Sequence, residues 1–577
     1  MKNMIYDDDG ILNKWPGFKK AFLNSLGSGS INGLFPYKDK IILAWGTKLF
    51  TFKDDGNQPV QIYEGMSGNR IRKNGSFIMN DKFYILDGKH YLQYDGTNIV
   101  DVCTIAHIPT VVMGAGKDGG GSPFEDFNLL NGTFYYSISP DGTSTTYNMM
   151  EGNVDTTPIT ISIDKGLTFN KIEGIDFTVI RQADKTIIDF SKGATPMGAP
   201  AVGTDSLKVK ACITVAGMKD KILNCTITGG FGGANDSHVF FTGNPDYKNT
   251  DWRSGVLDPT YIPENSWTNI GSNSEAITGY SIQYNTQVIQ KESGKFVRSF
   301  ELNNGDPVYS VQPINDERGL IAPDTLELID NNPFGLDKKG INALEGGTVR
   351  DERGTKHKSS AVDVDLLKED LTSGIAVDYN FKYWLVFPSG NAYVCDYKHV
   401  YADKNNLPQY EWFELDNIPA ACFCEANGYL YFGDNTTGMV YRFLKYSDVD
   451  RYQLDGKPIV AMWPSKRTNF GTDEYYKYIN TQTVTIKPET RASADVYYIT
   501  DQFYSPLVET IVKNIFSYSN MDYGSFSYNL SDFPQTETIE IREGDVSYYQ
   551  TVIKNDQLYC GMGIQRIEIE YELQGRR

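Results

Sequence analysis

Two-stranded hairpin patterns recur along this chain, and their spacing restricts the fold more than any other feature. YKDKIILAWGTKLFTF begins at Tyr37, and 42 residues later MNDKFYILDGKHYLQYDG begins at Met79. Each has a polar turn ending in Asp-Lys, a short apolar run, a glycine-containing turn and a second strand rich in aromatic residues, which is typical of a β-hairpin. The pattern returns at Tyr379 and Glu425, and in weaker form at His238 and Asn285.

Hairpins spaced by about 40–50 residues, each half of a four-stranded sheet, are typical of propeller blades. We therefore expect an all-β protein built on a β-propeller of six or seven blades. An irregular all-β protein with unrelated hairpins is the alternative. Only residues 359–374 resemble a helix, because they have an acidic start and a glycine at the end.

The hairpin spacing is interrupted twice, and this predicts two further β-domains. Residues 126–215 contain four or five short alternating strands split by turn residues, which is typical of a small β-sandwich inserted into a surface loop. From residue 447 the spacing disappears again, and the alternating strands that follow indicate a C-terminal β-domain. The predicted division is therefore 1–125 and 216–446 for the propeller, 126–215 for the inserted sandwich and 447–577 for the C-terminal domain.

Length and charge agree with a large folded protein of two or three domains. The net charge of −19 argues against tight, sequence-independent binding of nucleic acid, although DNA can slide past an acidic wall. Cys422 and Cys424 share one face of a strand and have no second Cys/His pair nearby, so we expect core thiols rather than a zinc site. The start of the chain lacks a signal-like apolar segment, and no run of about 20 apolar residues predicts membrane insertion.

No motif in the sequence predicts catalysis, a cofactor or a metal. The glycine-rich stretch at 108–132 is not a phosphate-binding loop, because Val111 stands where the first glycine is required and Asp118 follows the lysine. Asp7, Asp8 and Asp9 are adjacent rather than alternating, which favours a capped turn over a calcium loop. The five histidines are too far apart along the chain for metal spacing, and no nucleophile elbow is present. We therefore expect a protein that is not an enzyme.

Several stretches resemble a family of structural proteins from tailed bacteriophages and prophages of Gram-positive bacteria. The resemblance covers most of the chain except residues 303–362, and Trp15 stands where the family commonly has arginine before Pro-Gly. The stretches that carry it are YDDDGILNKWPGF, IPTVVMGAGKDGGGSPFEDFNLLNG, TGNPDYKNTDWRSGVLDPTYIPENSW, QYEWFELDNIPAACFCEANGYLYFGDNTTGMVYRF and KPIVAMWPSKRTNFGTDEYYKYINTQTVTIKPETRASADVYYITD.

The family resembles the tail-nozzle and head-stabilisation proteins of short-tailed phages, and this implies a virion structural role. Such a protein is made in the bacterial host cytoplasm and forms a hexameric ring in the tail, which continues the DNA channel and gates DNA exit. The implied partners are other copies of the chain, proteins on the portal or adaptor side, distal tail proteins, and DNA that passes without sequence-specific binding. The alternative is a tail propeller that binds or hydrolyses host glycans, which predicts paired carboxylates or stacked aromatic residues in a pocket at the channel mouth.

A ring of identical subunits needs head-to-tail contacts that close, and aromatic residues are typical of such interfaces. The loop-like stretch 238–267 is rich in them. The alternative is a stiff loop, held by its three prolines, that only covers the edge of one blade. We single out five of its residues, namely Trp252, Tyr261 and Trp267 as packing or subunit anchors and Arg253 and Asp258 as their polar partners.

Overall fold

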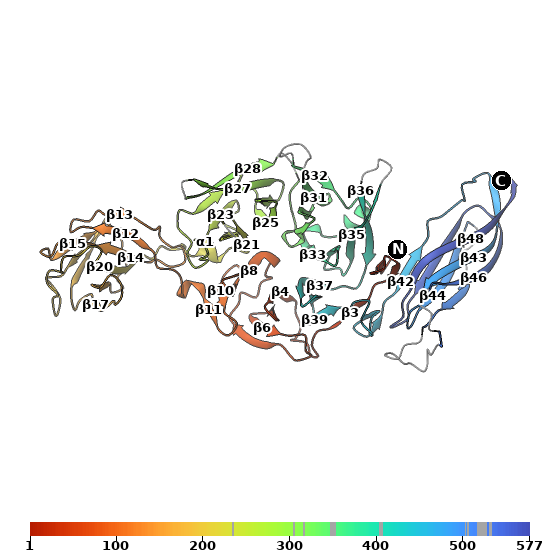
Figure 1. The fold of residues 1–577 in the computed structure, drawn as a ribbon, viewed down its shortest axis with the longest axis horizontal. Coiled ribbons are helices and arrows are strands. Elements are labelled where there is room, and N and C mark those ends of the chain that lie inside the picture. Colours follow the sequence, from red (N-terminus) through yellow and green to blue (C-terminus); the bar gives the residue numbers. More distant parts are fainter. Residues whose placement is uncertain are drawn as a thin grey trace. The chain divides into compact units, whose positions relative to one another are not determined.

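The computed structural model describes residues 1–577 except 234–235, 304–305, 315–317, 347–352, 403–407, 502–503, 505–506, 516–527, 530–532 and 577. The described residues are dominated by β-strands (Figure 1). They form two compact units, Met1–Gln61 with Asp324–Arg577 (unit 1) and Ile62–Pro323 (unit 2).

The predicted β-propeller is confirmed by a series of antiparallel sheets whose four strands are adjacent in chain order. Seven such sheets are present within the described residues, and the last of them is completed by a strand from the N-terminal segment. The first three sheets contain β4 (Ile31–Tyr37), β5 (Lys40–Trp45), β6 (Lys48–Phe52) and β7 (Val60–Glu64); β8 (Ser76–Met79), β9 (Lys82–Leu86), β10 (Tyr91–Tyr94) and β11 (Ile99–Asp101); and β21 (Ile227–Phe231), β22 (His238–Thr242), β23 (Thr250–Arg253) and β24 (Trp267–Asn269).

The remaining blades follow the same order. They contain β25 (Ile277–Gln283), β26 (Thr286–Lys291), β27 (Lys295–Asn303) and β28 (Asp306–Ile314); β29 (Glu327–Ile329), β30 (Asn332–Asp337), β31 (Gly340–Gly346) and β32 (Arg353–His357); β33 (Ile375–Tyr379), β34 (Lys382–Val386), β35 (Ala392–Ala402) and β36 (Pro408–Leu415); and β37 (Ala420–Ala426), β38 (Tyr429–Asp434), β39 (Val440–Phe443) and β3 (Gly17–Lys20).

The sequence hairpins correspond to the middle of the blades. Those that begin at Tyr37, Met79, Asn285, Tyr379 and Glu425 form the second and third strands of their sheets, as in β5–β6 and β34–β35. A tight turn precedes each of these strand pairs and joins the first two strands of the blade. In four blades both turn residues have positive φ, as the primed hairpin turns require, at Asn80-Asp81, Asp330-Asn331, Asn380-Phe381 and Asn427-Gly428.

The sheet of β29–β32 is the blade that the sequence analysis did not find. Its middle strands, NPFGLD and GINALEG, contain a single aromatic residue, Phe334, so they lack the aromatic second strand used as a marker. The turn at Asp330-Asn331 nevertheless repeats the turns of the other blades. A search for this turn, rather than for aromatic residues, would have located the sheet.

The last blade is closed by the N-terminal segment within unit 1. Strand β3 pairs antiparallel with β39 and parallel with β40 (Gln453–Leu454), which pairs in turn with β41 (Lys457–Pro458). Gly17 begins β3 with a φ of +85°, and a Cβ atom there would lie 1.9 Å from the carbonyl oxygen of Gln453. Only glycine fits this close approach of two backbones.

The interruption of the repeat in unit 2 contains two sheets with one shared core. The strands are β12 (Thr110–Ala115), β13 (Ser122–Pro123), β14 (Thr133–Ile138), β16 (Thr160–Ser162), β17 (Lys171–Ile172) and β20 (Leu207–Cys212) in one sheet, and β15 (Thr146–Met149), β18 (Thr178–Arg181) and β19 (Thr186–Asp189) in the other. Phe134, Tyr136, Tyr147 and Phe177 are fully buried between them. The alternating burial of β20 shows why its sequence LKVKAC has period two.

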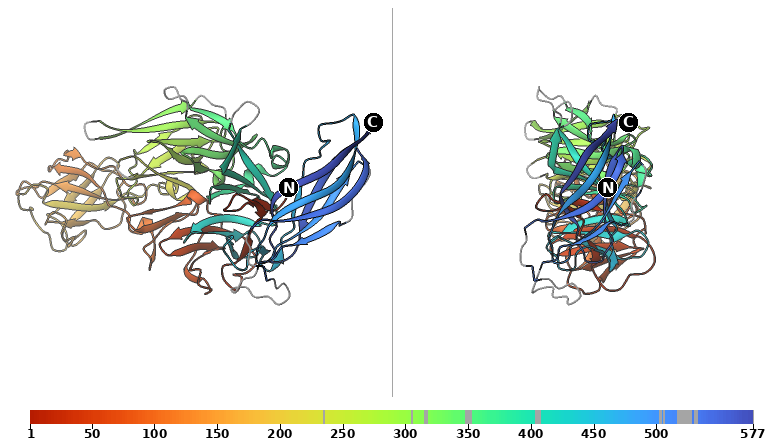
Figure 2. Two further views of the ribbon diagram at one scale, coloured as in Figure 1. Left: turned by 45° about the vertical axis from the view of Figure 1, so that its right-hand side comes forward. Right: turned by 90° about the vertical axis from the view of Figure 1, so that its right-hand side faces the viewer.

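The C-terminal part of unit 1 is also a pair of sheets, and Figure 2 shows their long twisted strands in blue. One contains β42 (Ala461–Pro464), β44 (Ser493–Thr500), β45 (Glu509–Val512) and β47 (Tyr549–Asn555); the other contains β1 (Met4–Tyr6), β2 (Leu12–Lys14), β43 (Tyr475–Lys487), β46 (Gln535–Val546) and β48 (Gly563–Arg576). The sequence analysis placed β1 and β2 in the propeller segment 1–125, whereas Leu12 pairs with Ile564 of β48. The other predicted segment limits stay predictions.

Helices are short throughout the described residues. Residues 359–374 form only α2 (Asp363–Leu366) and the 3₁₀ turn η4 (Leu371–Ser373), in which the Asp370 side chain accepts a hydrogen bond from the backbone N–H of Thr372. The remaining short elements are α1 (Asp220–Leu223), η1 (Lys73–Gly75), η2 (Val102–Thr104) and η3 (Pro323–Thr325).

Candidate functional site

The structure brings two of the five selected residues together on one blade of unit 2. Trp252 in β23 and Trp267 in β24 are direct cross-strand partners, so their side chains lie on the same face of the sheet. Trp252 is only 2% exposed and packs with Phe241 and Ile262 in the core, whereas Trp267 is 52% exposed. The pair therefore combines a packing residue with a residue that remains available for contacts.

The other three selected residues have separate partners inside unit 2. The Arg253 guanidinium lies over the ring of Tyr309 at 4.6 Å, and burial lowers its pKa. Asp258 accepts hydrogen bonds from the backbone N–H and the hydroxyl of Thr260, at 2.9 and 2.7 Å. Tyr261 donates to the carbonyl of Asp126 at 3.0 Å. These contacts tie the stretch 238–267 to its own unit, and a role in a subunit interface stays a prediction.

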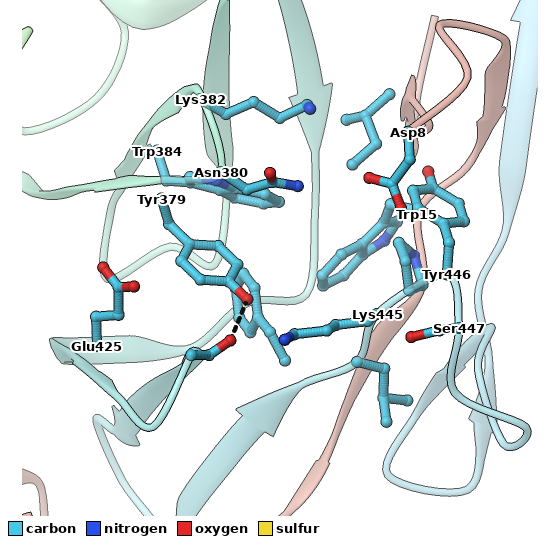
Figure 3. A pocket seen from close by; sticks show the side chains of 15 residues that line it. Asp8, Trp15, Tyr379, Asn380, Lys382, Trp384, Glu425, Lys445, Tyr446 and Ser447 are labelled. Atoms are coloured by element: carbon cyan, nitrogen blue, oxygen red, sulfur yellow. Dashed lines mark hydrogen bonds between the residues drawn. The ribbon is translucent and has the colours of Figure 1, made fainter.

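A second feature, a cavity of about 370 Å³, lies within unit 1 (Figure 3). Three segments far apart in the sequence line it: the N-terminal segment, the turn between β33 and β34, and the last blade with the residues that follow β39. Its lining combines aromatic and charged side chains, namely Trp15, Tyr379, Trp384, Phe443 and Tyr446 with Asp8, Lys382, Glu425 and Lys445.

The two lysines of this cavity already have partners. The Lys382 ammonium lies 3.5 Å from the buried carboxylate of Asp396. The Lys445 ammonium lies 4.1 Å from the centroid of the Tyr429 ring. Figure 3 shows the side chains of Asp8, Lys382 and Lys445 directed toward the open space. The cavity is therefore polar at its rim and aromatic at its walls.

The phenols of the cavity are poor acids and bases at neutral pH. Burial, followed by the nearby carboxylate of Glu425, raises the pKa of Tyr379 to about 12, and its hydroxyl donates to the carbonyl of Gly428 at 3.2 Å. Burial also raises the pKa of Tyr446 far above its usual value. Both phenols remain protonated at neutral pH, so neither is suited to transfer a proton.

A third feature is a buried polar network that joins β2 to the C-terminal sheets within unit 1. The Lys14 ammonium donates to the side-chain oxygen of Asn555 at 2.7 Å and to the carbonyl of Gln557 at 2.9 Å. The neighbouring Asn13 donates to Glu489 at 2.7 Å. Glu489 also accepts from Arg451 at 2.9 Å, so the carboxylate is held by both an amide and a guanidinium.

Sequence reasoning did not identify the cavity or the network. Their residues come from segments separated by hundreds of positions, as in the Lys14–Asn555 hydrogen bond, and no local pattern encodes such a meeting. The one available signal was Trp15, a large aromatic residue directly before Pro-Gly, which is 1% exposed in the propeller core.

The described residues contain neither a cluster suited to a metal ion nor a helix suited to a membrane span. In the part of the chain that the structure describes, no three His, Cys, Asp or Glu side chains gather closely enough to hold a metal ion. Among the helices in the described ranges, none is long and apolar enough to cross a membrane.

Comparisons with known proteins return only distant structural similarities. No family model and no curated protein matches the sequence. The crystal structure of BamB from Moraxella catarrhalis has a TM-score of 0.32 and 10% identity, over 74% of this chain and 98% of that one. The WD40 domain of Neurospora crassa Pan2 has a TM-score of 0.31 and 7% identity, over 73% and 90% of the two chains. YCF48 bound to D1 peptide has a TM-score of 0.35 and 8% identity, over 75% and 99%. Similarities of this size say nothing about the function of this chain.

Proposed function

We propose that the chain is a non-enzymatic structural subunit of a bacteriophage tail. In this role six copies form a ring at the tail nozzle, made in the host cytoplasm and carried in the virion. The ring contacts portal or adaptor proteins on one side and distal tail proteins on the other. It continues and gates the channel through which DNA leaves, without reading its sequence.

The observation that supports this proposal most is a pair of long hairpins that carry exposed apolar residues near the ends of their strands. In unit 2, β27 and β28 have nine residues each, whereas β25 and β26 have seven and six (Figure 1). Leu302 and Val308 lie near the tip of this hairpin and are 67% and 44% exposed. In unit 1, β35 has eleven residues and β33 has five, and Val400 and Tyr401 near the end of β35 are exposed.

Two different apolar patches on one chain suit a head-to-tail ring. A heterologous interface joins one patch of a subunit to a different patch of the next, and it closes into a ring when the rotation allows. Apolar side chains near the strand ends are exposed to water in the monomer, and their burial in a subunit interface stabilises the assembly. The buried network around Lys14 and Glu489 is a second supporting observation, because it joins the N-terminal segment to the C-terminal part of unit 1. A subunit that bears force requires such a connection.

The proposal is tested by assembly. The purified full-length protein should form rings visible by negative-stain electron microscopy, with a mass of six chains by light scattering, and antibodies should label the tails of purified virions. Leu302→Asp and Val400→Asp should each shift the mass toward the monomer while the circular dichroism spectrum is unchanged.

Leu167→Asp is the matched control for these variants. Leu167 is 84% exposed in the inserted sheets of unit 2, so the same change of charge there should leave the ring intact. A protein that stays monomeric at every concentration, and that is missing from particles, would refute the proposal.

A further inference from the structure

An open groove of about 800 Å³ lies along one blade of unit 2, beside the exposed indole of Trp267. It is bordered by the loop before β23, by β24 and by the loop that leads to β25. Aromatic, amide, hydroxyl and charged side chains all line it. They include Tyr247, Trp267, Asp246, Asn249, Asn269 and Asn273.

The aromatic residues of this groove are held in place by a buried one. The ring of Tyr247 meets Trp252 edge to face at a centroid distance of 5.6 Å and an angle of 81°. Trp267 is the cross-strand partner of the same Trp252. Trp252 is 2% exposed, while Tyr247 and Trp267 are 43% and 52% exposed. Two rings with accessible surface therefore flank one rigid buried indole.

Two amides of the groove are also held by hydrogen bonds. Asn249 donates to the carbonyl of Gly271 at 3.0 Å, and the Asn269 side-chain oxygen accepts from Thr250 at 2.7 Å. The Lys291 ammonium donates to the carbonyls of Ile270 and Ser272, at 2.8 and 2.6 Å, and thereby anchors the loop at the groove's edge. A rigid arrangement loses little conformational entropy when a ligand binds.

We propose that this groove binds a neutral oligosaccharide. A pyranose ring offers an apolar C–H face, which packs on an aromatic ring, and hydroxyl groups at its edge, which pair with amides and carboxylates. Trp267 and Tyr247 supply the aromatic surface, and the exposed side chains of Asp246, Asn269 and Asn273 supply the polar partners. A groove with aromatic walls and a few polar side chains is typical of a small-ligand site. The site is separate from the ring contacts proposed above and does not depend on them.

The experiment uses the full-length protein and a panel of neutral trisaccharides built from glucose, galactose or N-acetylglucosamine. Binding is measured by isothermal titration calorimetry up to about 10 mM sugar, a range that detects even a weak single site. We expect at least one trisaccharide to bind. Trp267→Ala should weaken its binding about tenfold or more, because the stacking surface is lost, and Asn269→Ala should weaken it severalfold.

Phe124→Ala provides the matched control. Phe124 is an exposed aromatic residue of the same unit, 65% accessible and outside the groove, so its removal should leave the sugar affinity unchanged. Light scattering on every variant separates a sugar site from a subunit contact.

Three results would overturn the proposal. The first is no binding by any trisaccharide in the panel. The second is binding that Trp267→Ala and Asn269→Ala leave unchanged. The third is a Trp267→Ala variant that no longer assembles into the ring of six chains, in a protein whose wild type binds no sugar. That result would make this face a subunit interface. Loss of sugar binding in a protein that still forms rings would support the groove and leave the structural role untouched.

Discussion

The buried amine of Lys14 should make the stability of unit 1 rise with pH above neutrality. Within the described residues its ammonium donates hydrogen bonds only to neutral oxygens, those of Asn555 and Gln557. Burial therefore lowers the pKa of Lys14 from 10.5 to about 8, and the more distant Cys560 and Asp556 offset only part of that effect. Between these two pKa values the unfolded chain binds more protons than the folded one, so raising the pH favours the folded state.

The magnitude follows from the two pKa values. At about 1.4 kcal/mol per pH unit, the difference between 10.5 and about 8 lowers the free energy of unfolding by about 3 kcal/mol at low pH. The free energy of unfolding is reduced by this full amount below pH 8, and it increases again as the pH rises from 8 toward 10.5. Integrated from pH 7 to pH 10, the gain attributable to Lys14 is about 2.5 kcal/mol.

The assay is urea unfolding at a series of pH values from 7 to 10, in reductant, followed by tryptophan fluorescence. Tyrosines, thiols and other lysines also titrate in this range, so the quantity of interest is the difference between wild type and Lys14→Met. That difference should change by about 2.5 kcal/mol in favour of the wild type as the pH rises. Lys457→Met, at an exposed lysine of β41, should give a flat difference. A flat difference for Lys14→Met as well would refute the reasoning.

Two further substitutions test the interior of the blades. The Arg298 guanidinium lies 2.6 Å from the carboxylate of Asp251, which is 1% exposed. Arg298→Met should reduce the free energy of unfolding by about 3–5 kcal/mol, because it leaves that carboxylate buried without its charged partner. In urea unfolding, the double variant with Asp251→Asn should regain much of this free energy. Gly17→Ala should cost at least about 3 kcal/mol in thermal or urea unfolding, since its Cβ would meet the Gln453 carbonyl at 1.9 Å in addition to the strain of a positive φ. Gly456→Ala, at a similar φ of +81° in open space, should cost only the backbone strain of about 1–2 kcal/mol. Equal costs at the two glycines would show that the close approach in β3 is unimportant.

The blades were predictable because their signal is local. A β-hairpin places its turn residues and its apolar alternation within about 20 positions, and the hairpins at 37–52 and 379–397 carry both. The blade at Glu327–His357 was missed because the prediction used aromatic residues, which pack the faces of sheets but are not required there. The turn at Asp330-Asn331 is required, since its backbone has positive φ at both residues.

The site features were less predictable because they depend on contacts between distant segments. Trp252, one of the residues selected from the stretch 238–267, is buried in the core, and Tyr247, at the groove, was not selected. Trp252 and Trp267 share one face of the sheet, but Trp252 lies in the inner strand β23 and Trp267 in the edge strand β24. The composition of the stretch does not specify which strand lies at the edge of the sheet.

The N-terminal segment shows how one short piece of chain can stabilise two parts of unit 1 together. Neighbouring residues of an extended strand point to opposite sides. Lys14 accordingly reaches Asn555 of the C-terminal sheets, while Trp15 is buried in the propeller core beside Trp384 and Phe443. Two residues later, Gly17 begins the strand that closes the last blade. Withdrawal of this segment would therefore open the blade and release the C-terminal sheets in one step, so the two should unfold cooperatively. The amine of Lys14 lies at this junction, and its protonation should weaken both attachments at once rather than the C-terminal sheets alone.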